Sequence, residues 1–257
     1  MRRIVLQLLL YSIAATLSGP LYATELRVAV AANFAETLTE IAARFEADTG
    51  QPVTIIRGST GKLYAQIING APFDIFLAAD SRRPELLENE GYAITGSRFT
   101  YAAGRLVLWS PDPDLVDVDG KVLASNDFRF LAIANPRLAP YGEAARQTLE
   151  KLGVWESLRG RIVQGENIGQ AYQFVASGNA SLGLIARSQP LSSSLAPAGS
   201  FWEVPASMHE PIMQQGVLLE DTQHARAFLD FMRAQPAVIV AHGYDLPGQN
   251  THNAYSR

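Results

Sequence analysis

The chain has 257 residues, of which 47% are hydrophobic and 18% are charged, and it contains no cysteine. This length is sufficient for one large domain or two smaller lobes with a substantial core, and the lack of cysteine excludes disulfides and cysteine-based metal sites. The formal net charge of −4 argues against nucleic acids and anionic membrane surfaces as partners.

Residues 1–23 have the features of a secretory signal peptide. Arg2 and Arg3 precede an apolar run from Ile4, and small residues follow before Ala23. The run is too short and too interrupted for a membrane span, so we expect cleavage after Ala23 and export to the periplasm. Removing Arg2 and Arg3 leaves 19 basic against 25 acidic residues, a net charge of −6. The alternative is an uncleaved anchor that tethers the protein to the membrane.

The mature chain alternates apolar runs, which predict strands, with segments of helical periodicity. In the first part the predicted strands are 26–30, 53–56 and 74–78, and the predicted helices are 33–49, 62–69 and 84–89. This alternation is typical of a parallel sheet with right-handed crossovers and helices on both faces.

The pattern changes after Tyr101 and then resumes. The later predicted strands are 106–109, 130–134, 161–163, 182–186 and 212–219, and the later predicted helices are 142–152, 169–177, 222–233 and 237–242. The composition predicts a surface loop at 189–200 and a polar, disordered tail at 250–257. We therefore predict two α/β lobes joined by two crossing strands, with lobe 1 formed by 24–104 and 206–257 and lobe 2 formed by 105–205.

The junction between the first strand and the first helix has a chemistry that suits an anion. Asn33 follows Ala32 there, and we interpret Asn33 as the helix N-cap, with Glu36 completing a capping-box-like pattern. The first backbone N–H groups of a helix have no partner within the helix and lie at the positive end of its dipole. A small oxyanion can therefore bind there without lysine or arginine, although an ordinary capped helix also explains this junction taken alone.

Three further junctions between a strand and a helix carry comparable donors. Ser59 and Thr60 lie in a glycine-flanked turn, Tyr141 lies at the start of a predicted helix, and Ile168 can offer a backbone N–H. Ligands of open α/β sheets bind beyond the carboxyl ends of the strands. A cleft between two lobes would therefore bring the four junctions together.

No catalytic arrangement is recognisable in the sequence. There is no Gly-x-Ser-x-Gly elbow and no His-Glu-x-x-His motif, and the histidines lie far from the glycine-rich junctions, at His209, His224, His242 and His252. The turn at 58–62 lacks the glycine and the hydroxyl residue of a nucleotide P-loop, because Ile56 and Leu63 occupy those positions. We interpret Asp80, Asp112 and Asp114 as solvated, and we expect neither enzymatic activity nor a cofactor.

Five segments, 28–34, 58–63, 67–79, 135–153 and 166–185, occur in an order that resembles the periplasmic molybdate-binding proteins of ABC importers. The resemblance extends over essentially the whole mature chain. It implies two α/β lobes of the type II periplasmic-binding-protein fold, with a tetrahedral oxyanion enclosed between them by neutral donors. It also implies a monomer, a membrane permease as partner, and molybdate or tungstate held through its oxygens without direct bonds from the protein to the metal.

Carried over residue by residue, the resemblance predicts these oxyanion-binding residues: Ala32, Asn33, Ser59, Thr60, Tyr141 and Ile168. Ala32 and Ile168 are expected to act through their backbones, and Thr60 is favoured over Ser59. One position departs from the family pattern, since Ala186 stands where some members have a tyrosine. Tyr141 is an alternative way to place a phenol, so this exchange bears on ion selectivity.

Alternative functions remain open at this point. A protein for sulfate or phosphate would use the same kind of site, and a protonated phosphate would need an acceptor, for which Glu166 is the nearest acidic candidate. An oxyanion sensor that serves no importer would also have the same sequence features.

Overall fold

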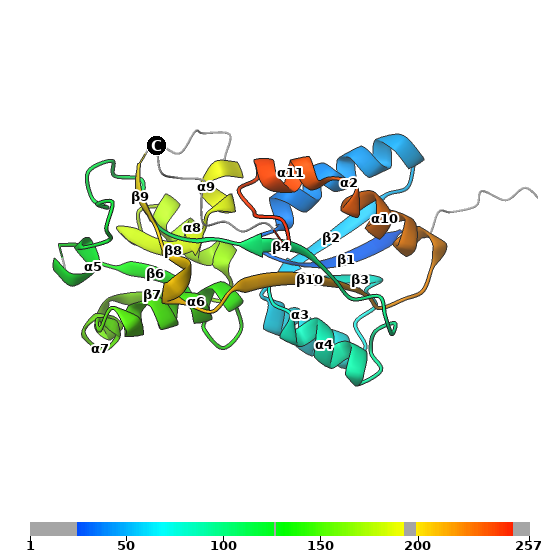
Figure 1. Ribbon diagram of the computed structural model, residues 1–257, viewed down its shortest axis with the longest axis horizontal. Coiled ribbons are helices and arrows are strands. Elements are labelled where there is room, and N and C mark those ends of the chain that lie inside the picture. Colours follow the sequence, from blue (N-terminus) through cyan, green and yellow to red (C-terminus); the bar gives the residue numbers. More distant parts are fainter. Residues whose placement is uncertain (1–24, 126, 193–198, 249–257) are drawn as a thin grey trace, which may run out of the picture.

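The computed structural model describes residues 25–125, 127–192 and 199–248, which form two mixed sheets covered by helices (Figure 1). The first sheet contains, in spatial order, β2 (Val53–Gly58), β1 (Leu26–Ala31), β3 (Ile75–Ala78), β10 (Ile212–Leu218) and β4 (Phe99–Gly104). The second contains β7 (Ile162–Gly165), β6 (Leu131–Ala134), β8 (Leu182–Ala186), β5 (Leu106–Ser110) and β9 (Ser200–Glu203).

Each sheet has apolar residues on both faces, and helices cover them. The helices on the first sheet are α2 (Ala35–Thr49), α10 (Gln223–Arg233) and α11 (Pro236–Ala241) on one face and α3 (Thr60–Ile68) and α4 (Arg82–Asn89) on the other. The helices around the second sheet are α5 (Val122–Ser125), α6 (Pro140–Lys151), α7 (Trp155–Leu158), α8 (Ile168–Ala176) and α9 (Ser188–Ser192). Short 3₁₀ turns lie at Arg159–Arg161 and Ala206–Met208. Val28 packs towards α2 and its neighbour Ala29 towards α3, as the two-residue period of a strand requires.

Strands that are linked by helices pair in parallel, as the sequence predicts. β1 pairs in parallel with β2 and β3, and β6 does so with β7 and β8. Each sheet is nevertheless mixed, because β10 is antiparallel to β3 and β4, and β5 is antiparallel to β8 and β9.

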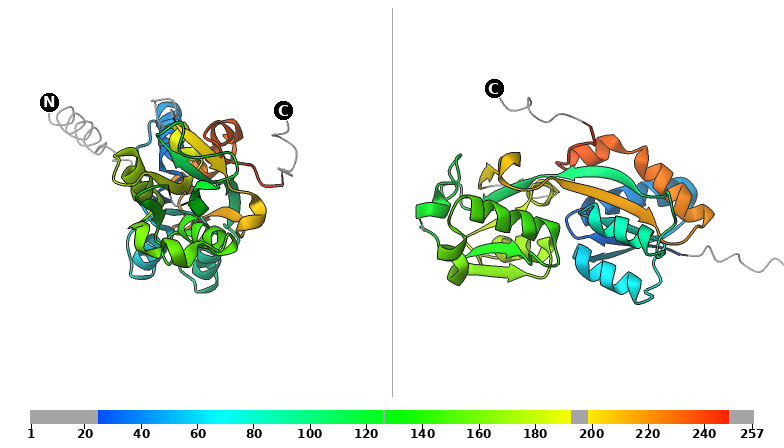
Figure 2. Two further views of the ribbon diagram at one scale, coloured as in Figure 1. Left: turned by 90° about the vertical axis from the view of Figure 1, so that its left-hand side faces the viewer. Right: turned by 60° about the horizontal axis from the view of Figure 1, so that its bottom comes forward.

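Two segments of chain pass between the sheets. β4 ends at Gly104 in the first sheet and β5 begins at Leu106 in the second, while β9 and β10 make the return connection. Figure 2 shows the two α/β lobes side by side with these segments running between them. The predicted fold of two α/β lobes joined by crossing strands is confirmed, and the exact lobe boundaries remain a prediction.

The sequence prediction does not include β4, α5 or α7, and it is wrong over one further interval. Residues 189–200 are predicted as a loop, but α9 occupies the start of this interval and β9 begins at its last residue. Phe201 and Trp202 pair with β5, so β9 owes its strand conformation to a partner distant in sequence. The predicted signal peptide 1–23 and the tail 250–257 lie outside the described residues. No described helix has the length and apolar character needed to cross a membrane.

Candidate functional site

The carboxyl ends of strands from both lobes meet in one apolar cluster. Ala31 and Ala79, which lie at the ends of β1 and β3, pack in the same cluster as Tyr141 and Ile168 of the second lobe. Ala32 is half-buried and packs against this cluster. Of the predicted site residues, Ala32, Tyr141 and Ile168 are therefore brought together by this cluster.

Asn33 is not the N-cap of α2, in contrast to the sequence interpretation. Phe34 occupies that position without a side-chain capping bond. The Asn33 amide turns inward instead, where Nδ2 donates to Oε1 of Gln214 at 2.8 Å and to the hydroxyl of Tyr244 at 3.1 Å. Oδ1 of Asn33 has no hydrogen-bond partner among the described residues. Glu36 also takes no capping role and pairs with Arg57 at 3.3 Å.

The backbone of Asn33 is held from the far end of the chain. Its carbonyl oxygen accepts hydrogen bonds from the hydroxyl of Tyr244 at 2.6 Å and from Oγ of Ser188 at 3.2 Å. Because Ser188 begins α9 in the second lobe, this bond also joins the two lobes. The turn that carries Asn33 is therefore fixed by groups that local sequence does not reveal.

Ser59 and Thr60 are buried at the start of α3, and their hydroxyls have different partners. Ser59 is the N-cap, and its Oγ accepts a hydrogen bond from the backbone N–H of Lys62 at 3.4 Å. Oγ1 of Thr60 accepts from the backbone N–H of Ala79 at 3.1 Å. Each hydroxyl oxygen acts as an acceptor in these bonds, which leaves its own proton available for donation.

Tyr141 lies in the first turn of α6, directly after Pro140, and is only 1% exposed. Its hydroxyl oxygen accepts a hydrogen bond from Nε2 of Gln214 at 3.4 Å. Burial raises the pKa of the Tyr141 phenol well above its ordinary value of 10.0, and the neighbouring Tyr244 and Tyr101 act in the same direction. The phenol therefore keeps its proton at neutral pH and is a hydrogen-bond donor.

Ile168 is the first residue of α8 and is buried. The side chain of Asn167 caps this helix by accepting from the N–H of Gln170 at 3.0 Å, and Ala171 N–H donates to the Asn167 carbonyl at 3.2 Å. The N–H groups of Ile168 and Gly169 precede these bonds, so they have no partner within the helix. The start of α8 also lies against lobe 1, because a Cβ on Gly169 would lie 3.5 Å from that of Ala32.

One buried residue that the sequence analysis missed connects several of these groups. Gln214 lies on β10 with 0% exposure, and its Oε1 accepts from Asn33 and, at 3.1 Å, from the hydroxyl of Tyr101. A signal was present in the sequence, since alternation along β10 places Gln214 on the same face as Ile212 and Gly216, where an unpaired polar side chain would be costly.

The partners of the predicted residues are neutral, and a charged pair lies farther out. Lys62 and Glu166 form an ion pair of 2.9 Å between the lobes, with both side chains about half exposed. Glu166 is therefore engaged by a lysine. Among the described residues, no group of three or more His, Cys, Asp or Glu side chains could hold a metal ion.

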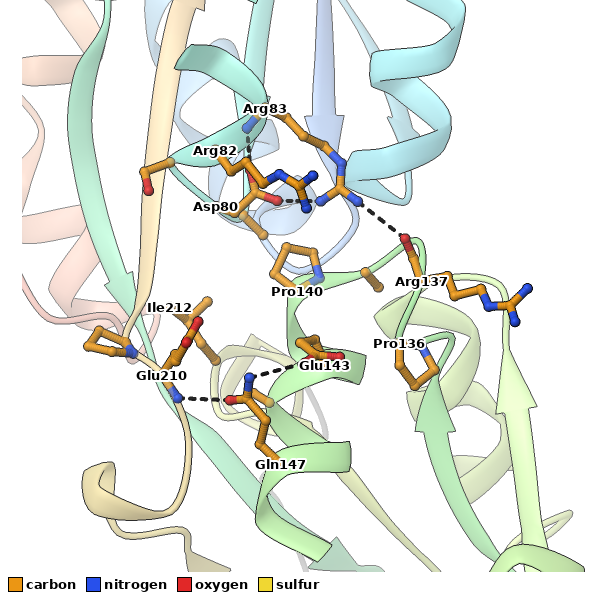
Figure 3. Close-up of a pocket in the computed structure, with 15 residues that line it drawn as sticks. Asp80, Arg82, Arg83, Pro136, Arg137, Pro140, Glu143, Gln147, Glu210 and Ile212 are labelled. Atoms are coloured by element: carbon orange, nitrogen blue, oxygen red, sulfur yellow. Dashed lines mark hydrogen bonds and ion pairs between the residues drawn. The ribbon is translucent and has the colours of Figure 1, made fainter. Parts of the chain in front are cut away.

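A second feature of the interlobe region is a cavity of about 530 Å³, shown in Figure 3. Lobe 1 contributes Asp80, Arg82 and Arg83, and lobe 2 contributes Arg137 and Glu143. Nη2 of Arg83 donates to the Arg137 carbonyl at 3.2 Å, which joins the lobes on this side. The predicted oxyanion-binding residues do not line this cavity.

Comparison with known proteins identifies the family. The family model described as "Bacterial extracellular solute-binding protein" matches residues 26–245. The molybdate-binding protein ModA of Azotobacter vinelandii is 51% identical over 229 residues, covering 87% of this chain and 91% of the relative. ModA of Rhodobacter capsulatus is 46% identical over 231 residues, covering 89% of this chain and 90% of the relative.

A solved structure agrees with these matches. The periplasmic molybdate-binding protein of Azotobacter vinelandii superimposes with a TM-score of 0.83 at 47% identity, covering 86% of this chain and 99% of that one. The resemblance indicated by the sequence is confirmed. The chain thus belongs to the family of bacterial extracellular solute-binding proteins.

Proposed function

We propose that this protein captures molybdate between its two lobes, binds tungstate similarly, and delivers the ion to an ABC transporter. The observation that carries the proposal is the meeting of four buried junctions between strands and helices, whose hydrogen-bond partners are neutral. The names of the relatives from Azotobacter and Rhodobacter support molybdate as the ion.

The chemistry of the junctions suits a fully deprotonated oxyanion. Helix starts at Thr60, Tyr141 and Ile168 provide backbone N–H groups at the positive ends of three helix dipoles. The Thr60 and Tyr141 hydroxyls add donors whose oxygens already accept from the protein. Asn33 contributes through its backbone N–H, because both N–H bonds of its side-chain amide are used within the protein.

Neutral donors explain both affinity and selectivity. A dianion that leaves water loses its hydration, and convergent charge-assisted hydrogen bonds offset this loss. Because the donors are fixed on helix starts, ions are distinguished by whether their oxygens reach them. Molybdate and tungstate nearly coincide in shape and charge, whereas sulfate is smaller and a protonated phosphate also needs an acceptor. Tyr141 would supply the phenol that Ala186 cannot provide.

The two-lobed architecture suits delivery to a membrane partner. The crossing strands form a hinge, and ligand-linked closure about a hinge is a common transition in two-lobed binding proteins. We infer that the exported monomer presents its closed form to the permease in the periplasm. The signal peptide predicted from residues 1–23 supports this location.

The decisive experiment is calorimetric titration of the mature chain, beginning at Thr24, with molybdate, tungstate, sulfate and phosphate. We expect one ion to bind per chain, with similar affinities for molybdate and tungstate, and at least about tenfold weaker binding of sulfate and phosphate. Molybdate should also raise the melting temperature without being turned over. Tighter binding of sulfate or phosphate than of molybdate would contradict the proposal.

A further inference from the structure

Gln214 is a buried polar residue that contacts both lobes. It is fully buried on β10, one of the strands adjoining the crossing segments, and the pairing register with β4 shifts between Gln214 and Gln215. Its amide contacts Asn33 and Tyr101 of lobe 1 and Tyr141 of lobe 2. It is therefore a neutral side chain that links the predicted site residues of both lobes.

Hydrogen-bond accounting fixes the orientation of this amide. Oε1 of Gln214 accepts from Nδ2 of Asn33 at 2.8 Å and lies 3.1 Å from the Tyr101 hydroxyl, whose single proton is also within reach of the Ala78 carbonyl at 3.0 Å. The Asn33 amide is itself oriented by Tyr244, whose proton goes to the Asn33 carbonyl and whose oxygen accepts from Nδ2. The NH₂ group must then face the opposite way, towards the hydroxyl oxygen of Tyr141 at 3.4 Å.

This orientation determines what Tyr141 can do. Because its hydroxyl oxygen accepts a bond from Gln214, its proton must point elsewhere. The only hydrogen bond of this hydroxyl within the described part of the chain is the one that it accepts. A buried phenol held in this way can donate its proton to an acceptor such as an oxyanion oxygen.

We propose that Gln214 is a positioning residue that fixes the Tyr141 hydroxyl as a hydrogen-bond donor to the bound oxyanion. The inference rests on the proposed function. Tyr141 is on α6 of lobe 2 and Gln214 is on β10 of the first sheet, so their bond joins the two lobes.

A double-mutant cycle separates this role from a structural one. Molybdate affinity is measured by calorimetry for the unmodified protein, Gln214→Met, Tyr141→Phe and the double variant. We expect each single substitution to weaken binding about tenfold, and we expect the double variant to bind no more weakly than Tyr141→Phe alone. Independent effects would instead multiply to a loss of about 100-fold and would overturn the inference, as would unchanged affinity in Gln214→Met.

The adjacent residue provides a matched control. Gln215 lies on the same strand, where Nε2 donates to Oγ1 of Thr100 at 3.0 Å and Oε1 accepts from Arg98 at 3.2 Å. Gln215→Met therefore removes the same type of side chain and two hydrogen bonds without touching Tyr141. We expect unchanged molybdate affinity in this variant, and a loss equal to that of Gln214→Met would show a merely structural effect.

The variant Gln214→Glu tests the hydrogen-bonding role through a pH dependence of molybdate affinity, which a change in packing alone would not produce. A protonated carboxyl can imitate the amide, with its O–H towards Tyr141 and its carbonyl towards Asn33. The carboxylate instead accepts the Tyr141 proton and repels an anion. Molybdate affinity of this variant should therefore fall at least about tenfold as the pH rises from about 5.5 to about 8.5. A loss that does not depend on pH would overturn the inference.

The phenols around this position keep their protons in that range. Burial raises the pKa of each facing phenol, those of Tyr101, Tyr141 and Tyr244. The carboxylates that act on them, Asp80 and Asp245, are each held in an ion pair with an arginine. The unmodified protein should accordingly show a flat affinity profile. Failure of the unmodified protein to bind molybdate would overturn the proposed function itself. Independent effects of the two substitutions in the double-mutant cycle would overturn only the role of Gln214.

Discussion

Lys62 and Glu166 join the two lobes through an ion pair of 2.9 Å at the rim of the interlobe contact. Beside it, the backbone N–H of Gly61 donates to the Leu138 carbonyl at 2.8 Å. Lys62 follows Thr60 by two residues, yet its ammonium group pairs with a carboxylate instead of a predicted site residue. This cation, close in sequence to the predicted site, therefore forms an ion pair between the lobes.

Lys62→Met should consequently have a small effect that depends on salt. Ion pairs between half-exposed groups contribute about 0–1 kcal/mol, so we expect molybdate affinity to fall no more than about fivefold, and less at high ionic strength. Calorimetry at two salt concentrations measures this. Arg57→Met, which breaks the Arg57–Glu36 pair within lobe 1, is the control and should not change affinity. A large loss that persists at high salt would mean that Lys62 contacts the anion.

Thr60 and Ser59 should differ in their effect on oxyanion binding. Thr60→Val keeps the shape of the side chain but removes the hydroxyl, so we expect oxyanion binding to weaken by about 1–3 kcal/mol. It also leaves the buried N–H of Ala79 without its acceptor, so we expect the free energy of unfolding to fall as well. Ser59→Ala removes the N-cap of α3 and should lower the free energy of unfolding by about 1 kcal/mol. Titration and urea denaturation of both variants test this. If Thr60→Val binds molybdate normally, Thr60 is not a ligand residue.

Gly61→Ala should weaken binding without destabilising the fold. A Cβ on Gly61 would lie 3.1 Å from the Leu138 carbonyl oxygen and from Nη2 of Arg83, so we expect this interlobe contact to loosen by a few tenths of an ångström. Alanine favours the helical conformation of α3 by about 1 kcal/mol over glycine, so the melting temperature of the ligand-free protein should not fall. Gly160→Ala, where a Cβ meets nothing within 4 Å, is the matched control. Equal molybdate affinities in Gly61→Ala and Gly160→Ala would show that the close contact between Gly61 and Leu138 does not affect binding.

The buried phenols predict a stability loss in alkali. Burial raises the pKa of Tyr101 and Tyr141 well above the ordinary value of 10.0. A group with a raised pKa in the folded state binds its proton more tightly there, so its contribution is fully present below pH 10 and is lost as the pH rises above it. Urea denaturation across this range should show a declining free energy of unfolding. The decline should be shallower in Tyr141→Phe, and an identical slope would contradict the assignment.

Local sequence was enough for the framework of the molecule. The alternation of apolar runs and helical periodicity predicts most strands and helices and the two α/β lobes, because these patterns act over a few residues. Helix starts at Ser59, Thr60 and Ile168 were found for the same reason, since the unpaired N–H groups of a first turn follow from the helix itself. β9 was missed because a four-residue edge strand depends on its partner.

Tertiary structure alone decided how the side chains at the site are used. Asn33 has the local pattern of a helix cap, but its amide binds Gln214, 181 residues away, and Tyr244, 211 residues away. Such partners outweigh a local capping bond because a buried amide must be satisfied wherever the fold places it. Periodicity within a segment carries no information about those distances, so the sequence determined which junctions could bind an anion, and the packing of the two lobes decided which atoms face it.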